Sequence, residues 1–177
     1  LDPGHHPNRS YFAQMIPNFV VAVKEHLRSG ANLADLDVVG QDFMKNFHQV
    51  KHIPNRLSSM MYERTAQLYK QNVITGDQLF LVDKELKEFS DILGACERIK
   101  NTPIPYSFVY LLTLPFGFVV IAEYMTIPIV MLVSFVLLTV ELIAEEIEDP
   151  FGSDINDLPT DQLSMKIKEN VREILLR

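Results

Sequence analysis

The chain has 177 residues and a formal net charge of −7, from 16 basic and 23 acidic side chains. This acidic balance excludes a general nucleic-acid binder, because a phosphate backbone is bound by a basic surface. The single cysteine, Cys96, excludes an intrachain disulfide framework and indicates a reducing compartment.

The first hundred residues are expected to be helical. Apolar residues recur at spacings of three and four in three segments, Tyr11 to Arg28, Ile53 to Gln71 and Asp77 to Lys100. Pro17 lies inside the first segment and is expected to kink or end that helix. The residues before the third segment, Thr75-Gly76-Asp77, provide turn and cap chemistry. Residues 31–47 are weakly patterned and predict at most short helices.

The stretch from Ile104 to Ala144 is apolar, and its only formally charged side chains are Glu123 and Glu141. It contains two apolar blocks, Ser107–Ala122 and Tyr124–Val140, each a little shorter than the roughly 20 residues of a membrane-spanning helix. We interpret it as a membrane hairpin.

An acidic segment follows the hairpin. Eight acidic residues and no basic residue lie between Glu141 and Asp161, and an amphipathic helix is predicted over 161–176. No segment alternates in the manner of a strand, so the expected fold class is all-α. We divide the chain into a cytosolic helical region (1–100), a transmembrane hairpin (101–144), and a cytosolic acidic turn with a C-terminal helix (145–177).

Three segments, in this order around an apolar hairpin, resemble the bestrophin family of ion channels in its bacterial and fungal form. They are Gly94-Ala95-Cys96-Glu97-Arg98-Ile99 with Thr102-Pro103-Ile104-Pro105, then Glu141-Leu142-Ile143-Ala144-Glu145-Glu146-Ile147-Glu148-Asp149-Pro150-Phe151-Gly152, and finally Asn156-Asp157-Leu158-Pro159-Thr160-Asp161. The resemblance covers most of the chain and is strongest from about Ile53 onward.

The resemblance implies a homopentameric channel subunit in the plasma or inner membrane, with its soluble helices in the cytoplasm. Its partners would be other copies of itself, the lipid bilayer and the permeant ions, which are chloride and other anions or, as in some bacterial members, monovalent cations. The family has four membrane helices and a pore neck formed by an early one. This chain starts roughly where the cytosolic helices begin, so no neck residue can be placed in it. The block Ser107–Ala122 is also about two helical turns shorter than in the family.

The resemblance places Asp77 where the family narrows its cytosolic aperture. Five copies would form an acidic ring, and rings of Asp or Glu favour cations. Alternatively, Asp77 is only a helix N-cap. The sequence leaves both roles open.

The acidic turn is the second candidate site. Animal members of the family bind calcium after a Pro-Phe-Gly turn, but here Ser153, Ile155 and Asn156 interrupt the carboxylates. Calcium takes six to eight oxygen ligands, and this row supplies fewer evident ones. We therefore expect no cofactor, and favour a charged turn that packs subunits together over a calcium site. The residues in question are Glu145, Glu146, Glu148, Asp149, Asp154 and Asp157.

His48 and His52 are four residues apart and could share a metal ion on a helix, but no third ligand is evident, so surface histidines are the preferred interpretation. The sequence shows no nucleophile–base arrangement and no phosphate-binding loop, so an enzyme is not expected. Two alternatives to a channel remain. One is a membrane-anchored helical scaffold or regulatory subunit without a pore, and the other is a soluble bundle with Ile104–Val140 as its buried hairpin.

Overall fold

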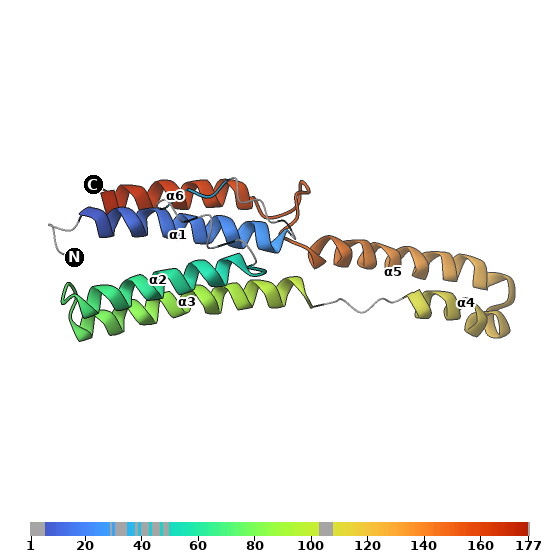
Figure 1. Cartoon of the computed structure of the whole chain (residues 1–177). Coiled ribbons are helices and arrows are strands. Elements are labelled where there is room, and N and C mark those ends of the chain that lie inside the picture. The colour runs from blue at the N-terminus through green and yellow to red at the C-terminus, as the bar shows by residue number, and fades with distance from the viewer. Residues whose placement is uncertain are drawn as a thin grey trace. The chain divides into compact units, whose positions relative to one another are not determined.

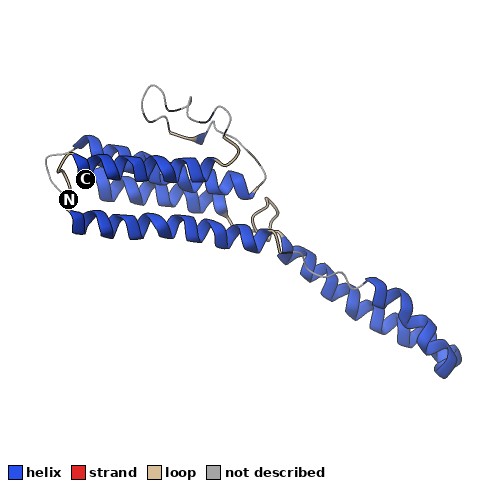
Figure 2. Ribbon diagram, turned by 60° about the horizontal axis from the view of Figure 1, so that its bottom comes forward, coloured by secondary structure: helices blue, strands red, loops and turns tan. Residues whose placement is uncertain are grey.

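The computed structural model describes residues 6–28, 30, 35–37, 39, 43, 47, 50–102 and 108–176, and every extended element in these ranges is a helix (Figures 1 and 2). The all-α prediction is therefore confirmed. The elements are α1 (His6–Leu27), α2 (Ile53–Lys70), α3 (Gly76–Lys100), α4 (Phe108–Ala122), the short 3-10 helix η3 (Glu123–Met125), α5 (Thr126–Glu148) and α6 (Thr160–Leu176).

Helix α1 continues through Pro17, so the expectation that Pro17 could end this helix is wrong. Proline removes one backbone hydrogen bond from a helix. Here the residues on both sides of it, among them Met15 and Phe19, are buried in one core, and Pro17 itself is fully buried. The free energy of this burial outweighs the lost bond. The short helices expected within 31–47 lie mostly outside the described residues.

The chain forms two compact units, which we describe separately. The first comprises residues 1–98 and 158–177, and the second comprises residues 99–157. In the first unit α1 lies between α2 and α6 (Figure 1), and α3 contributes Leu86 and Leu93 to the same core. The rings of Phe19 in α1 and Phe89 in α3 meet edge to face, with centroids 5.1 Å apart.

The apolar stripes predicted for α2 and α3 form the core of the first unit. Leu57, Met61 and Leu68 of α2 are buried, and so are Leu86 and Leu93 of α3. These spacings of four and seven residues place the side chains on one face of each helix. Tyr69, the neighbour of Leu68, is 46% exposed and lies outside the core.

The second unit contains a hairpin of α4 and α5, joined by η3. Glu123 adopts a left-handed conformation at this turn, with φ of 44°. The Thr126 hydroxyl, at the start of α5, donates a hydrogen bond of 3.0 Å to the Phe118 carbonyl oxygen in α4. This bond and the turn hold the two helices antiparallel.

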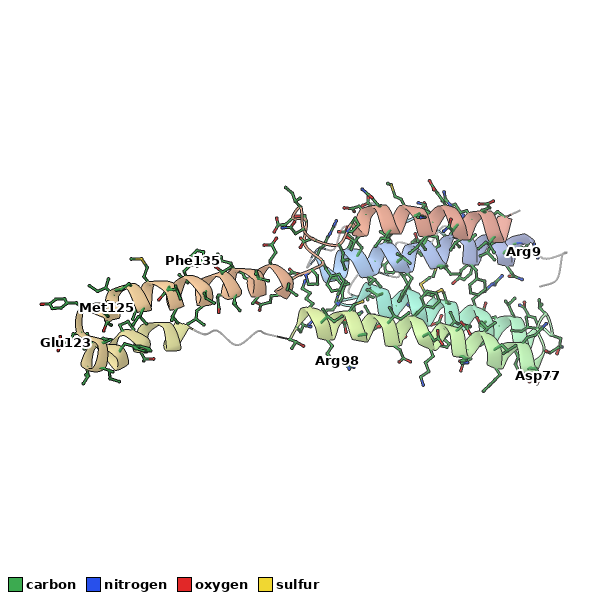
Figure 3. The ribbon with its side chains drawn as sticks, turned by 180° about the vertical axis from the view of Figure 1, so that it is seen from behind. Arg9, Asp77, Arg98, Glu123, Met125 and Phe135 are labelled. Atoms are coloured by element: carbon green, nitrogen blue, oxygen red, sulfur yellow. The ribbon has the colours of Figure 1, made fainter. Side chains whose placement is uncertain are left out.

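The hairpin exposes apolar side chains along most of its length. Within the described residues, one stretch, Pro115–Glu148, is long and apolar enough to cross a membrane, and none of its most apolar window is buried. Phe135 in α5 is 71% exposed and points away from the hairpin (Figure 3). The structure thus contradicts the alternative of a soluble bundle with this hairpin as its buried core.

The two helices of the hairpin differ in length. Helix α5 has 23 residues and is about 35 Å long at 1.5 Å per residue. Helix α4 has 15 residues and is about 22 Å long, which is shorter than a hydrocarbon core of about 30 Å. The first apolar block therefore forms a short helix, as its sequence suggested.

Candidate functional sites

Asp77 lies in the first turn of α3, at the opposite end of that helix from Arg98 (Figure 3). It is not the N-cap. The Thr75 hydroxyl accepts a hydrogen bond of 3.3 Å from the Gln78 N–H, and the Gln78 side chain accepts one of 3.0 Å from the Thr75 N–H. This reciprocal pair is a capping box, with Gln in the position of the acidic partner. The N-cap role considered for Asp77 is therefore wrong.

The Asp77 carboxylate is exposed, and it makes no hydrogen bond or ion pair with any other described residue. It thus remains available for a role outside its own helix. Whether it lines an aperture stays a prediction.

The acidic turn follows α5 in the second unit. The Asp157 carboxylate accepts a hydrogen bond of 2.7 Å from the Asp154 N–H, and the Asn156 amide donates one of 2.7 Å to Glu146. Two of the predicted carboxylates thus stabilise the turn itself. A Cβ added at Gly152 would lie 2.6 Å from an Asp157 carboxylate oxygen, so the turn needs a glycine there unless this side chain moves.

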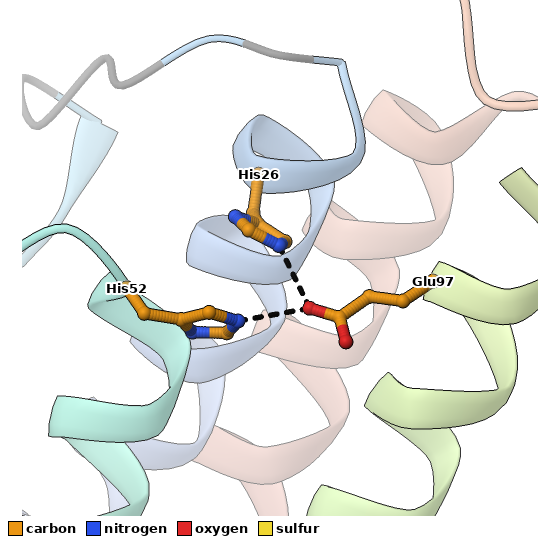
Figure 4. Close-up of side chains that lie close together, drawn as sticks. All are labelled: His26, His52 and Glu97. Carbon is orange, nitrogen blue, oxygen red and sulfur yellow. Dashed lines mark hydrogen bonds and ion pairs between the residues drawn. The ribbon is translucent and has the colours of Figure 1, made fainter. Parts of the chain in front are cut away.

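A group of three titratable side chains occurs in the first unit, at one end of its helices (Figure 4). His26 lies in the last turn of α1, His52 is the N-cap of α2, and Glu97 lies in the last turn of α3. In each histidine, Nε2 lies 2.8 Å from the same Glu97 oxygen, Oε1. Among the described residues, this is the only set of three such side chains whose ligand atoms all lie within 4.8 Å of one another.

The environment of this triad favours an ionised Glu97. Hydrogen bonds from His52 and, more weakly, from His26 hold the pKa of the Glu97 carboxyl below its ordinary value, although partial burial opposes the shift. The side chains of His26, His52 and Glu97 are each 32% exposed, so small ions can reach the group from solvent.

The His48–His52 pair considered from the sequence did not lead to this group. His48 lies outside the described residues, and His52 pairs with His26 and Glu97. The missing signal was topological. In an up-and-down bundle, the end of the first helix, the start of the second and the end of the third meet at one end. His26, His52 and Glu97 occupy these three helix ends.

Cys96, the neighbour of Glu97 in the chain, is partly buried. Burial, and to a lesser degree the Glu97 charge, raises the pKa of its thiol. A raised thiol pKa leaves little thiolate at neutral pH, so Cys96 is a poor nucleophile and a poor metal ligand.

An all-helical unit joined to an uncovered apolar hairpin indicates a helical membrane protein. The family model of the bacterial/fungal bestrophin proteins matches residues 2–173 of the chain. The chain therefore belongs to the bacterial/fungal bestrophin family, as its three motifs suggested.

Individual relatives agree with this assignment. The chain is 28% identical to the voltage-dependent anion channel-forming protein sll1024 of Synechocystis, over 98% of this chain and 60% of that protein. It is 39% identical to the voltage-dependent anion channel-forming protein YneE of Escherichia coli K12, over 64% of this chain and 40% of that protein. The chain thus spans 40–60% of the length of these two curated relatives.

A crystal structure of a variant bacterial bestrophin homolog from Klebsiella pneumoniae matches the fold with a TM-score of 0.80. The two chains are 26% identical, and the match covers 99% of this chain and 69% of that one. The Synechocystis alignment runs over 183 positions, more than the 177 residues of this chain, so that relative has residues here that this chain lacks.

Proposed function

We propose that this chain is a subunit of a bestrophin-like channel through which chloride and other anions cross a membrane passively. One observation carries the proposal: a chain of the bestrophin family has a hairpin whose most apolar window is exposed. Its relatives are named as anion channel-forming proteins, which supports the same function here.

The membrane location rests on the composition of the hairpin. Ile121 at the end of α4 is 84% exposed, and Met131 and Leu132 in α5 are 68% and 67% exposed. Each buried apolar side chain of this size contributes about 1.5–3 kcal/mol relative to an exposed one, so water is an unfavourable solvent for this surface. We assign the hairpin to the bilayer of the plasma or inner membrane in a multi-pass protein, and the first unit to the cytoplasm.

Self-association rests on α3. Its outward face carries Phe80, Leu81 and Ile92, which are 72%, 62% and 61% exposed in the single chain. Charged residues such as Lys84 and Glu88 lie between them, so a lipid environment does not suit this face. A second copy of the chain would cover it, and a homopentamer around a central pore is the assembly that we propose.

The ion preference of the channel has two candidate assignments, anions and monovalent cations. The names of the relatives favour anions. Asp77 favours monovalent cations, because its exposed carboxylate has no partner among the described residues, and five copies around a pore would attract cations.

Purified protein from the complete gene, incorporated into planar bilayers, tests these assignments together. Reversal potentials in asymmetric sodium chloride should be displaced toward the chloride equilibrium potential for an anion channel, and toward the sodium potential for a cation channel. Absence of current from a verified pentamer would refute the channel. A monomer or dimer in detergent without current would instead support a membrane-anchored scaffold or regulatory subunit.

The contribution of Asp77 is tested by the variant Asp77→Asn, which removes the charge and keeps the shape. We expect its reversal potential to shift toward the chloride equilibrium potential. The matched control is Asp83→Asn, an exposed carboxylate of the same helix on a different face. Equal shifts in both variants, or none in either, would remove Asp77 from the selectivity-determining residues.

A further inference from the structure

We propose that His26, His52 and Glu97 form a binding site for a divalent transition-metal ion of the zinc class. The site would join the ends of three helices of the first unit (Figure 4). It is separate from the candidate aperture, because Asp77 and Glu97 are 20 positions apart in α3, which corresponds to about 30 Å along the helix.

The donor atoms select the kind of ion. Two imidazole nitrogens and one carboxylate oxygen are the protein ligands of many zinc sites that keep a fourth position for water. Calcium and magnesium prefer oxygen ligands throughout, so the two histidines argue against either ion.

The geometry requires only a small adjustment. In a tetrahedral zinc site with bonds of about 2.0–2.1 Å, neighbouring ligand atoms lie about 3.3 Å apart. The two nitrogen–oxygen distances here are 2.8 Å each, and all three ligand atoms lie within 4.8 Å of one another. Side-chain rotations that increase these nitrogen–oxygen distances by about half an ångström would make room for an ion.

The tautomer of the His52 ring determines whether a metal ion must displace a proton from Nε2. Its Nδ1 accepts a hydrogen bond of 3.3 Å from the Asn55 N–H, so in the metal-free protein the ring proton is on Nε2 and is donated to Glu97. Coordination through Nε2 transfers this proton to Nδ1, and the bond from Asn55 is then broken. The proton count of the neutral ring does not change, and the Asn55 amide becomes a reporter of metal binding.

His26 has no such competing bond in the described structure. Its Nδ1 makes no hydrogen bond to another described residue, so this nitrogen can carry the proton while Nε2 coordinates the ion. The two rings lie with centroids 4.3 Å apart at an angle of 42°, and both present Nε2 to the same point. In the metal-free protein the same triad is a hydrogen-bonded cluster that joins three helices, and this role is the competing explanation for it.

Zinc titration of the detergent-purified, EDTA-treated protein distinguishes a metal site from a purely hydrogen-bonded cluster. We expect one zinc ion per chain, a higher apparent melting temperature with zinc than with magnesium, and the visible absorption bands of tetrahedral cobalt after loading with Co²⁺. X-ray absorption of the zinc-loaded wild type should report two imidazole nitrogens and one carboxylate oxygen, and this measurement needs no variant. Absence of stoichiometric zinc binding, or sulfur in the coordination shell, would overturn the proposal.

Two matched variants assign the ligands. His26→Gln keeps a side chain that can donate to Glu97 but removes a metal ligand, and should weaken zinc binding by at least about 100-fold, since even outer partners of such ligands contribute 10- to 100-fold. His48→Gln removes the histidine that the sequence paired with His52, and should bind zinc as the wild type does. Zinc binding that is unchanged in His26→Gln, or that is lost in His48→Gln, would contradict the proposed triad.

Discussion

Asn18 in α1 provides the sharpest test of what holds the first unit together. Its side chain is only 1% exposed. The Asn18 amide donates a hydrogen bond of 2.7 Å to the Asp37 carbonyl oxygen, and the Asn18 carbonyl accepts one of 2.7 Å from the Asp37 N–H. The Asp37 carboxylate in turn accepts bonds from Lys168 and Arg172 of α6, at 2.9 and 2.8 Å. Asp37, which lies in the segment after α1, thus bonds to both α1 and α6.

The variant Asn18→Ala removes both hydrogen bonds to the Asp37 backbone. Each contributes about 1 kcal/mol net, and the two backbone groups left without their partner add a desolvation penalty of about 1 kcal/mol or more. We therefore expect a destabilisation of about 3 kcal/mol. For a chain of this size it corresponds to a decrease of about 6–12 °C in the apparent melting temperature.

Thermal unfolding of the detergent-purified protein, followed by circular dichroism, measures the effect of Asn18→Ala against two controls. Asn170→Ala changes an exposed asparagine of α6 and should leave the melting temperature within about 2 °C of the wild type. Asp37→Ala keeps the backbone bonds and removes only the ion pairs to α6, which contribute about 1 kcal/mol or less in a partly exposed position. If Asn18→Ala matched Asp37→Ala, the backbone hydrogen bonds would not be the stabilising interaction.

Two further predictions concern helix termini. Thr75→Ala removes the cap of α3 and should lower the free energy of unfolding by about 1 kcal/mol. The melting temperature should then decrease by about 2–4 °C, and an unchanged melting temperature would refute the capping box. Hydrogen bonds from Lys24 and Arg28 hold the pKa of Asp161 below its ordinary value of 3.8, so this carboxylate stabilises the fold above about pH 4 and ceases to do so as the pH falls further. Asp161→Asn should therefore melt below the wild type at pH 7 and by a smaller margin near pH 3, and an equal difference at both values would contradict this origin.

Local sequence patterns were sufficient for most of the fold. The stripe through Leu57 and Met61 predicted the buried face of α2, because a helical period of 3.6 residues determines which side chains share a face. The same reasoning did not show that the helix continues through Pro17, since the rule for proline describes an isolated helix. Burial of Met15 and Phe19 on either side of Pro17 is a tertiary effect that the local pattern does not contain.

The candidate sites were harder to predict, for a physical reason. Glu97 is 71 positions from His26 and 45 from His52, so no local motif connects the three residues. They meet only because antiparallel helices bring alternate helix ends together. The role of Asp77 was open for a different reason: Thr75 and Asp77 are both good N-cap residues, and only the hydrogen bonds of the folded turn show which one is used.

Both units expose apolar side chains, but the residues around these side chains differ. This difference indicates that the hairpin surface inserts into the membrane and that the α3 surface binds another subunit. On the hairpin, residues such as Ile127 and Phe135 are exposed with no basic residue between Ser107 and Ala144, so this exposed surface suits lipid. On α3, Phe80 and Ile92 alternate with Lys84, Glu88 and Asp91, and ionised groups at that density are unfavourable in hydrocarbon. That face needs a protein partner with water at its rim. Replacing Phe80 by a charged residue should therefore dissociate the oligomer while the protein remains in the membrane fraction, and loss from the membrane fraction would show that the two surfaces are not independent.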